Sequence, residues 1–309
     1  MLAGIDVGKL NLDVSMGGDK TVVFSNTVEG IDALTMALHE AGVTRIVCEP
    51  TGGYEREMVR ALRTSRLQVQ IAHPNKVRAF AQACGILAKT DRIDAQVLYR
   101  YGETFDDQAS IPLGDKPLKL RDILRRRQQL MSSRTQELNR LEKHPGAVAR
   151  ASCERHLVWL EAEIAELDQA LKTQLGEPEL KHQAGLYSSV KGVGLITAAT
   201  LIAELPELGR FDGKSLTALA GLAPWSRDSG KQRGYRAIRG GRASVRKALY
   251  MAAISAIRTN GAMRSFYLRL RHRGKAGKVA LVAVMRKMLL LLNAIAHRGT
   301  PWVENPVRA

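Results

Sequence analysis

The sequence predicts an α/β protein whose first part holds a mixed β-sheet and whose remainder is mainly α-helical. Three observations support this prediction. Short apolar runs separated by turn residues fill residues 1–72, helical spacing of apolar residues follows Pro74, and leucine-rich heptad patterns occupy residues 120–171. Antiparallel strands followed by alternating strands and helices give a mixed sheet with helices on its faces. The predicted domains are residues 1–112, 113–182 and 183–309.

The first domain can be divided into its elements from the N-terminus onward. Strands are expected at residues 2–7, 10–16, 21–26, 45–48 and 67–72. Helices are expected near residues 31–41, from Tyr54, after Pro74 and over residues 91–101. In the last of these helices the apolar residues recur at helical spacing, at Ile93, Val97, Leu98 and Tyr101.

Four acidic residues of this domain stand where they can converge. Asp6 ends the first strand, Glu49 ends the fourth, and Asp91 and Asp94 share one face of the last helix. Divalent cations such as Mg²⁺ or Mn²⁺ prefer oxygen ligands, and two such ions can stabilise the attacking and leaving oxygens of a phosphodiester exchange. A ribonuclease-H-like nuclease fold needs acids at these positions. Asp13 is an alternative to Glu49 as the second of the four acids, and we rank it below Glu49.

The charge of the chain is concentrated in its last part. Residues 1–112 hold 12 Lys and Arg against 14 Asp and Glu, and residues 113–182 hold 13 against 11. Residues 183–309 hold 22 against 5, which accounts for the net charge of +17. Such a concentration on one module is typical of phosphate binding, although it does not distinguish DNA from RNA.

Composition excludes several other classes of protein. The 309 residues are 45% hydrophobic, which is enough for a folded core. Cys48, Cys84 and Cys153 are too widely spaced for a disulfide framework or a zinc cluster, so a reducing cytoplasm is expected. The N-terminus lacks the pattern of a signal peptide. Because Arg286 and Lys287 split the apolar run over residues 279–292, no membrane span is expected.

Residues 113–182 are predicted to form a helical hairpin. Heptad seams run from Leu120 to Leu141 and from Leu157 to Leu171, and Pro145-Gly146 breaks the helix between them. Arg127 and Arg134 occupy seam positions, so the pair is expected to be partly solvated or to meet an acidic or nucleic-acid partner. A spacer or oligomerisation arm and a purely intramolecular hairpin remain equally open.

Residues 183–309 carry two further motifs. Gly192 and Gly194 form a turn before an apolar helix, a helix-hairpin-helix-like feature whose backbone N–H groups can bind a phosphate. Ser229 lies in a stretch, residues 227–247, with eight Lys and Arg and one acid, where cations can hold a scissile phosphate. From the residues alone, Ser229 is first of all a turn residue. Ser226 and Ser244 are competing candidates for a nucleophilic serine.

These motifs together resemble the insertion-sequence-110 family of DEDD transposases and its Piv-type invertase relatives. The segments that carry the resemblance span nearly the whole chain, in the order of the family: 6–9, 49–54, 89–95, the turn at 192–194, 221–224 and 229–230. The resemblance implies a RuvC-like N-terminal domain, a coiled-coil arm and a C-terminal transposase domain. It also implies that Asp6, Glu49, Asp91 and Asp94 bind divalent metal and that Ser229 is the nucleophile that becomes linked to DNA.

The resemblance further implies partners for the protein. They are double-stranded donor and target DNA and a structured non-coding bridge RNA that pairs with both. Further copies of the chain are expected in a dimer or tetramer. The expected location is the cytoplasm, in association with the nucleoid. The candidate nucleic-acid contacts are Lys191, Gly192, Gly194, Arg227, Lys231, Arg233, Arg236, Arg242 and Arg246. Residues 238–246 depart from the Lys-Arg-Gly-Asn-like run of many relatives, which weakens the case for Arg242 and Arg246.

The sequence leaves three alternative functions open. A RuvC-like hydrolytic nuclease acting on branched DNA would need the four acids but not Ser229. A non-enzymatic nucleic-acid-binding protein would need neither. An actin-like ATPase is suggested by Asp6-Val7-Gly8, but a second phosphate loop is missing from the sequence and the C-terminal part is basic.

Overall fold

The structure is a computed structural model, which describes residues 1–18, 20–105, 114–225 and 237–303. The chain divides into two compact units, Met1–Ile111 and Pro112–Ala309, and each unit is described by itself.

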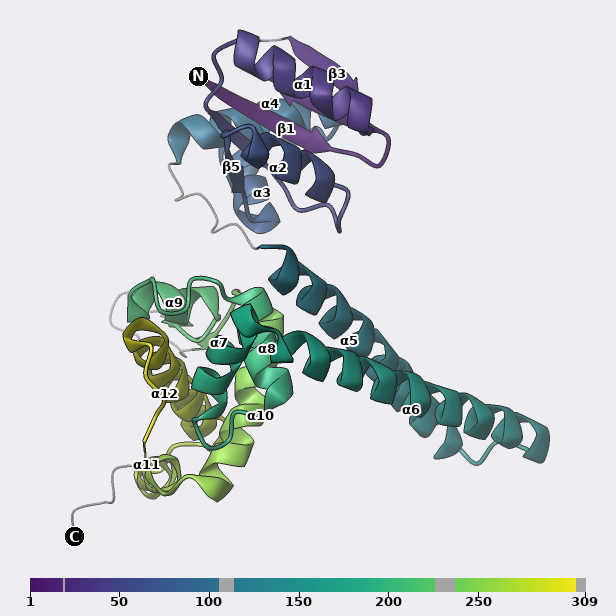
Figure 1. Ribbon diagram of the computed structural model, residues 1–309, viewed down its shortest axis with the longest axis vertical. Coiled ribbons are helices and arrows are strands. Elements are labelled where there is room, and N and C mark those ends of the chain that lie inside the picture. Colours follow the sequence, from purple (N-terminus) through teal and green to yellow (C-terminus); the bar gives the residue numbers. More distant parts are fainter. Residues whose placement is uncertain (19, 106–113, 226–236, 304–309) are drawn as a thin grey trace. The chain divides into compact units, whose positions relative to one another are not determined.

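A five-stranded mixed sheet forms the centre of the first unit (Figure 1). Its strands are β1 (Leu2–Val7), β2 (Asn11–Ser15), β3 (Thr21–Ser25), β4 (Arg45–Cys48) and β5 (Gln68–Ile71). The order across the sheet is β3-β2-β1-β4-β5; β1, β2 and β3 pair antiparallel, whereas β4 pairs parallel with both β1 and β5. The predicted mixed sheet is confirmed, with strand ends that differ from the predicted ones by at most one residue.

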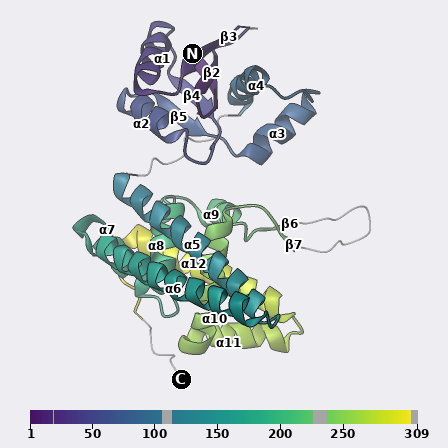
Figure 2. The ribbon, with the colours of Figure 1, turned by 90° about the vertical axis from the view of Figure 1, so that its right-hand side faces the viewer.

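Four helices cover the two faces of this sheet (Figures 1 and 2). They are α1 (Val28–Glu40), α2 (Arg56–Thr64), α3 (Pro74–Ala83) and α4 (Asp91–Thr104). Ile5 and Ile46 belong to a core with α1 and α2, whereas Val47 belongs to a second core with α3 and α4. Successive strand residues face opposite sides, so each strand serves both cores. This arrangement is consistent with a RuvC-like fold.

The second unit begins with a pair of long helices, α5 (Asp115–Leu141) and α6 (Ala147–Gly176). The two helices pack against each other within one chain, with Leu130, Leu160 and Ile164 buried between them. The two Arg residues of the predicted seam find acids on the facing helix. Arg127 Nε lies 2.6 Å from Asp168 Oδ1, and Arg134 Nη2 lies 2.8 Å from Glu161 Oε1.

The α5–α6 pair resolves one open point of the sequence. The seam Arg residues are not left for a nucleic acid, because each is paired with a carboxylate of the same hairpin. Leu120, Leu171 and Leu175, at the base of the pair, belong to the same core as the helices that follow. The division of this unit into domains at residues 182 and 183 stays a prediction, as does a coiled-coil arm that joins several copies.

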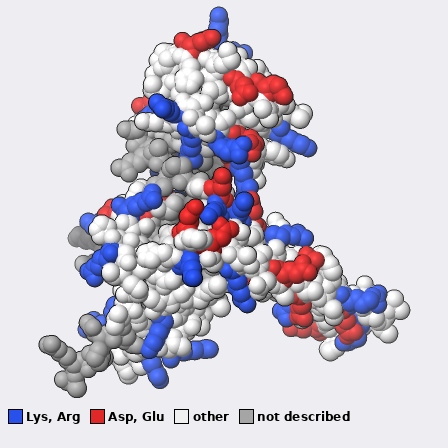
Figure 3. All heavy atoms as spheres, viewed as in Figure 1, with Lys and Arg blue, Asp and Glu red and all other residues white. Residues whose placement is uncertain are grey.

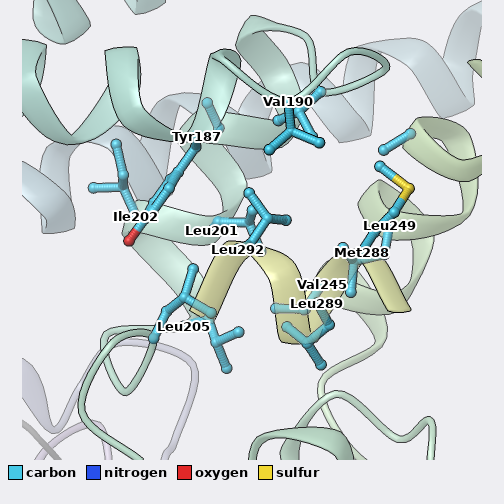
Figure 4. Packing of buried hydrophobic residues seen from close by; sticks show 14 of the residues in the cluster. Tyr187, Val190, Leu201, Ile202, Leu205, Val245, Leu249, Met288, Leu289 and Leu292 are labelled. Carbon is cyan, nitrogen blue, oxygen red and sulfur yellow. The ribbon is translucent and has the colours of Figure 1, made fainter. Parts of the chain in front are cut away.

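The remaining elements form a mainly helical body. They are α7 (Pro178–Ser188), α8 (Leu195–Glu204), α9 (Gly213–Leu219), β6 (Pro224–Trp225), β7 (Ala237–Ile238), α10 (Ala243–Thr259), α11 (Gly261–His272) and α12 (Gly277–Arg298). Figure 4 shows side chains of α10 and α12, among them Leu249 and Met288, packed in a core with Tyr187 and Leu201.

Helix α12 is the central helix of this body. Among the described residues it is the one helix that is long and apolar enough to cross a membrane, judged by length and composition alone. Its apolar side chains, however, are used inside the protein. Val284, Met288, Leu289 and Leu292 are fully buried in the core of the unit. A core helix of a folded domain therefore accounts for the hydropathy of residues 277–298.

Candidate active site

Strand register brings Asp6 and Glu49 to adjacent positions at one end of the sheet. In the parallel β1–β4 pair, Ile5 is the partner of Cys48, and Asp6 and Glu49 are the next residues of the two chains. Val47, two residues before Glu49, packs in the core on the α4 side of the sheet. Because residues two apart on a strand face the same side, both carboxylates face α4.

Gly4 explains how α4 reaches the same place. A Cβ at Gly4 would collide with the backbone nitrogen of Tyr99 and the carbonyl oxygen of Ala95, so the backbone of α4 lies directly against β1. Asp6 is two residues along the strand on this face, and Asp94 immediately precedes Ala95 on the helix. The close approach therefore sets the first turn of α4 beside Asp6.

The first turn of α4 presents both of its aspartates. Thr90 caps the helix, and its hydroxyl accepts a hydrogen bond from the Ile93 N–H at 3.3 Å. Asp91 and Asp94 follow in that first turn, Asp91 exposed and Asp94 half-buried. Carboxylates are favourable at a helix N-terminus because of the positive end of the helix dipole. The cap fixes where the helix begins, and thereby where the two carboxylates project.

The pKa shifts indicate that the four predicted acids share one electrostatic environment. Burial raises the pKa of Asp6 to about 6, and the neighbouring carboxylates of Asp94, Asp91 and Asp13 add to the shift. Burial also raises the pKa of Glu49, followed by the charges of Asp6 and Asp94. Like charges that come close disfavour the ionised form of each. The structure thus brings together the four acids that the sequence singled out.

Three further residues belong to this environment. Asp13 lies directly opposite Asp6 in the antiparallel β1–β2 pair, so its carboxylate is on the same face. Burial raises the pKa of Asp13, with a contribution from Asp91. Burial likewise raises the pKa of Asp94, which the cations of Lys89 and Arg78 partly oppose. Asp13 and Glu49, which compete for one role on sequence grounds, lie on the same face in the structure.

The donor set fits a divalent cation in its chemistry. It consists of carboxylate oxygens, which Mg²⁺ and Mn²⁺ prefer. Burial first, and neighbouring carboxylates after it, raise the pKa of Asp6, Glu49 and Asp94, and a bound cation would relieve that repulsion. Within the described ranges, no group of three or more His, Cys, Asp or Glu side chains is arranged as a ready metal centre.

Two residues that the sequence did not single out hold the loops around these acids. The Glu55 carboxylate accepts hydrogen bonds from the Thr51 N–H at 3.0 Å and the Gly53 N–H at 2.9 Å, which fixes the loop after Glu49. The Asn26 side-chain amide donates to the carbonyl oxygens of Gly8, at 2.9 Å, and Tyr54, at 3.2 Å. Asn26 thereby links the exit of β1 to the loop after β4.

In the second unit, two backbone segments meet at glycines. A Cβ on Gly221, where φ is +66°, would collide with the Gly240 carbonyl, and one on Gly241, where φ is +65°, would collide with the Gly221 backbone. The contact brings the chain before β6 against the chain after β7, strands that flank residues 226–236 in the sequence. Ser229 and the competitor Ser226 lie outside the described residues, as do Arg227, Lys231, Arg233 and Arg236.

Arg242 is engaged inside the protein. Its guanidinium donates to both carboxylate oxygens of Glu207, at 2.5 and 2.6 Å, and to the Glu204 carbonyl oxygen at 2.9 Å. Because the Glu207 side chain is only 5% exposed, the pair ties the chain after β7 to the turn that follows α8. A contact between Arg242 and a phosphate stays a prediction. Arg246 also donates, to the Gly240 carbonyl oxygen, but lines a surface groove.

The predicted phosphate-binding turn has a packing role as well. Gly192 has φ of +102°, and a Cβ there would lie 2.7 Å from the Ala256 Cβ on α10, so only glycine fits. Gly194 is the N-cap of α8 and is exposed, with no side chain capping that helix. Lys191 is exposed beside it. Phosphate binding at Lys191, Gly192 and Gly194 stays a prediction.

Comparison with known proteins adds direct evidence for the family. Residues 3–144 match a family described as Transposase, the DEDD transposase of IS110, and residues 184–268 match the Transposase IS116/IS110/IS902 family. The chain belongs to the IS110 family of transposases. The first match contains all four carboxylate positions and the second contains Ser229.

The relatives of this IS110-family chain are of two kinds. The pilin gene-inverting protein of Moraxella bovis is 28% identical over 97% of this chain and 96% of its own length, and that of Moraxella lacunata is 27% identical with the same coverage. An uncharacterised 43.6 kDa protein of insertion element IS110 from Streptomyces coelicolor is 31% identical over 44% of this chain and 35% of its own length. Family membership makes the chain a DNA-rearranging enzyme with DNA as its substrate.

Proposed function

We propose that the chain is a DNA recombinase of a mobile element, which excises and inserts DNA by metal-assisted phosphoryl transfer through a phosphoserine intermediate. The observation that supports this most strongly is the gathering of Asp6, Glu49, Asp91 and Asp94 on one face of the sheet. Carboxylates brought together against their mutual repulsion are typical of sites for divalent cations.

The proposed roles follow from the chemistry of each group. Divalent ions held by the four carboxylates would polarise the scissile phosphate and stabilise its developing charge. Ser229 would supply the attacking oxygen, which bonds to phosphorus as the bond from phosphorus to the leaving deoxyribose oxygen breaks. The serine proton passes to solvent, and the leaving oxygen takes up a proton. The family resemblance supports the role of Ser229, which lies outside the described residues.

The remaining parts of the proposal concern partners. A structured non-coding RNA would select donor and target by pairing, which leaves the protein to bind backbones and shape. The chain would act as a dimer or tetramer, because cutting and rejoining two DNA sites requires more than one cleavage centre. The setting would be the cytoplasm, on the nucleoid. These parts rest on the family resemblance.

DNA inversion is a second candidate reaction. The two pilin gene-inverting proteins align with this chain along nearly its whole length, whereas the insertion-element protein aligns over less than half of it. Inversion and transposition would use the same cleavage chemistry and differ in how the cut ends are joined. A plasmid that carries the element's ends in inverted orientation distinguishes the two by the restriction pattern of its product.

The phosphoserine step has a direct test. Native protein incubated with labelled DNA of the element's ends, Mg²⁺ and any co-purifying RNA should form a covalent protein–DNA adduct on a denaturing gel. Ser229→Ala should remove the adduct and the recombination while leaving DNA binding intact. Ser244→Ala, on a competing serine, is the matched control and should still form the adduct.

The outcomes separate the mechanisms. A Ser229→Ala protein that still forms the adduct would exclude this serine as the nucleophile. A Ser229→Ala protein that cuts DNA at the native rate without an adduct would identify a hydrolytic, RuvC-like nuclease with water as the nucleophile.

A further inference from the structure

A surface groove of the second unit is lined from four elements. It encloses a cavity of about 850 Å³ between α5, α10, α12 and the β6–β7 pair, a size typical of sites for small organic groups. We call it the α10–α12 groove. Its apolar lining residues are Leu222, Pro224, Ile238, Tyr250, Met251, Val279, Val282, Ala283 and Met285. Gln128 of α5 adds a polar side chain.

The groove leaves large apolar side chains open to solvent. Tyr250 is 37% exposed, Met251 is 63% exposed and Val279 is 48% exposed. Their neighbours on the same helices, Leu249 and Ala280, are fully buried in the core. The exposed residues therefore belong to a second apolar face of α10 and α12, beyond what the core of the unit uses. Apolar surface gathered around a cavity is typical of a binding site.

Cations line the same groove. Arg246 and Lys247 of α10, with Lys278 and Arg286 of α12, belong to its lining, and the described lining residues include no Asp or Glu. The whole sequence from Ser229 to Val303 lacks acidic residues. In Figure 3, the α11 end of this unit displays Lys and Arg without Asp or Glu, whereas the α5–α6 pair displays both signs. A ligand complementary to this lining would combine an apolar group with negative charge.

A nucleotide has that combination. Its base is flat and can stack on an aromatic ring, and its phosphates pair with Lys and Arg. A base inside a duplex is already stacked and paired, so the groove suits an unpaired nucleotide. Pro224 and Ile238 line the groove, and in the sequence they flank residues 226–236, the segment that carries Ser229.

We propose that the α10–α12 groove binds an unpaired nucleotide of the DNA strand next to the cleavage point, with its base on Tyr250 and its phosphates on the four lining cations. The proposal rests on the proposed recombinase function, in which strands must separate before they are exchanged. Gln128 would offer its side-chain amide to the edge of the base. Recognition of this kind tolerates any base, because every base has a stacking face.

Fluorescence anisotropy with the full chain tests the groove. The probes are fluorescein-labelled oligo(dT), a duplex of matched length and oligo(rU), all in EDTA, so that binding is measured without strand cleavage. Tyr250→Ala should weaken oligo(dT) binding by about fivefold or more, the loss expected for one base–aromatic contact. Tyr250→Phe should keep native affinity. Duplex binding should change little in either variant.

A second variant in the groove and a control variant outside it complete the binding experiment. Met251→Glu places a negative charge in the groove and should also weaken oligo(dT) binding, because it repels the phosphates. Trp159→Ala removes an exposed aromatic residue of α6, 47% exposed and remote in sequence, and should have no effect. The failure of this proposal is distinguishable from that of the recombinase function, which is measured by cleavage and adduct formation with Mg²⁺.

Several results would overturn the proposal. Native oligo(dT) affinity in both Tyr250→Ala and Met251→Glu would exclude the groove as a DNA site. Equal losses for oligo(dT) and duplex would exclude an unpaired base, and tighter binding of oligo(rU) than oligo(dT) would make the occupant RNA. A fall in particle mass by light scattering in Met251→Glu, with unchanged DNA affinity, would make the groove a protein interface.

Discussion

Gly4 is the residue on which the geometry of the carboxylates depends, since it lets the α4 backbone lie against β1. Gly4→Ala should therefore push α4 away from the sheet and destabilise the first unit by about 1–3 kcal/mol or more, the cost of overpacking. Thermal unfolding measures the loss. Gly185→Ala, in helix α7 with no atom within 4 Å of the new Cβ, is the control and should be neutral or stabilising. Equal melting temperatures for native protein and Gly4→Ala would contradict the packing argument.

Asp6 predicts a specific pH dependence. Burial and neighbouring carboxylates raise its pKa to about 6, so the folded protein keeps a proton that the unfolded chain releases above about pH 4. The stability that the protonated carboxyl contributes is present at low pH and is lost as the pH rises through about 6. Without metal, Asp6→Asn should then be more stable than the native protein at neutral pH, by about 1–2 kcal/mol after solvent screening.

Thermal unfolding in EDTA at acidic and neutral pH tests this sign. Asp32→Asn, on an exposed acid of α1, is the control and should melt as the native protein does. Added Mg²⁺ should raise the melting temperature of the native protein and not that of Asp6→Asn, because a ligand stabilises the state that binds it. A lower melting temperature for Asp6→Asn than for native protein at neutral pH in EDTA would refute the electrostatic account.

At the scale of residues, sequence predicted the identities of the acids better than their surroundings. Asp6 and Glu49 could be identified from the sequence because each ends an apolar run. Asp94 could be identified because apolar residues at helical spacing follow it. The position of Asp13 opposite Asp6 depends on strand register, which is set by long-range pairing. The Arg242–Glu207 pair was not predictable, since it joins residues 35 apart in sequence.

At the scale of elements, α5 and α6 show what a heptad pattern can determine. The pattern predicted two helices and the break between them, but not which helix each seam would face. In the structure the seams face each other, and Arg127 and Arg134 pair with Asp168 and Glu161 of the facing helix. Charged partners across the seam cannot be identified until the facing helix is known.

Two neighbouring residues of α6 test this packing. Leu160 is 1% exposed between the helices, whereas Val158 is 70% exposed. Leu160→Lys should unfold the hairpin at a lower temperature, with a loss of about 2–5 kcal/mol, because the apolar contact disappears and a charge is buried. Val158→Lys should leave the melting curve unchanged. Far-UV circular dichroism follows both, and equal melting temperatures for the two variants would contradict the internal seam.

At the scale of the whole molecule, the charge distribution predicts where DNA is held. Replacing Arg264, Arg269 and Arg273 of the second unit, all exposed, with Gln should weaken duplex binding and reduce the slope of log affinity against log salt by about three. The matched control changes Lys20, Arg66 and Arg100, exposed residues of the first unit, to Gln. Anisotropy titrations over a range of salt measure both. A larger change of slope in the control than in the test variant would contradict this assignment.

We propose that Asp6 of β1, Glu49 directly after β4 and the two aspartates of the first turn of α4 form the divalent-metal site of DNA cleavage. The most direct measurement is a denaturing gel of labelled element-end DNA incubated with Mg²⁺ and native protein, Asp6→Asn, Asp94→Asn or the control Asp32→Asn, with DNA binding measured alongside. Asp6→Asn and Asp94→Asn should bind DNA as the native protein does and fail to cut it, because each removes a charged oxygen ligand. Native cleavage by Asp6→Asn or Asp94→Asn would contradict the claim.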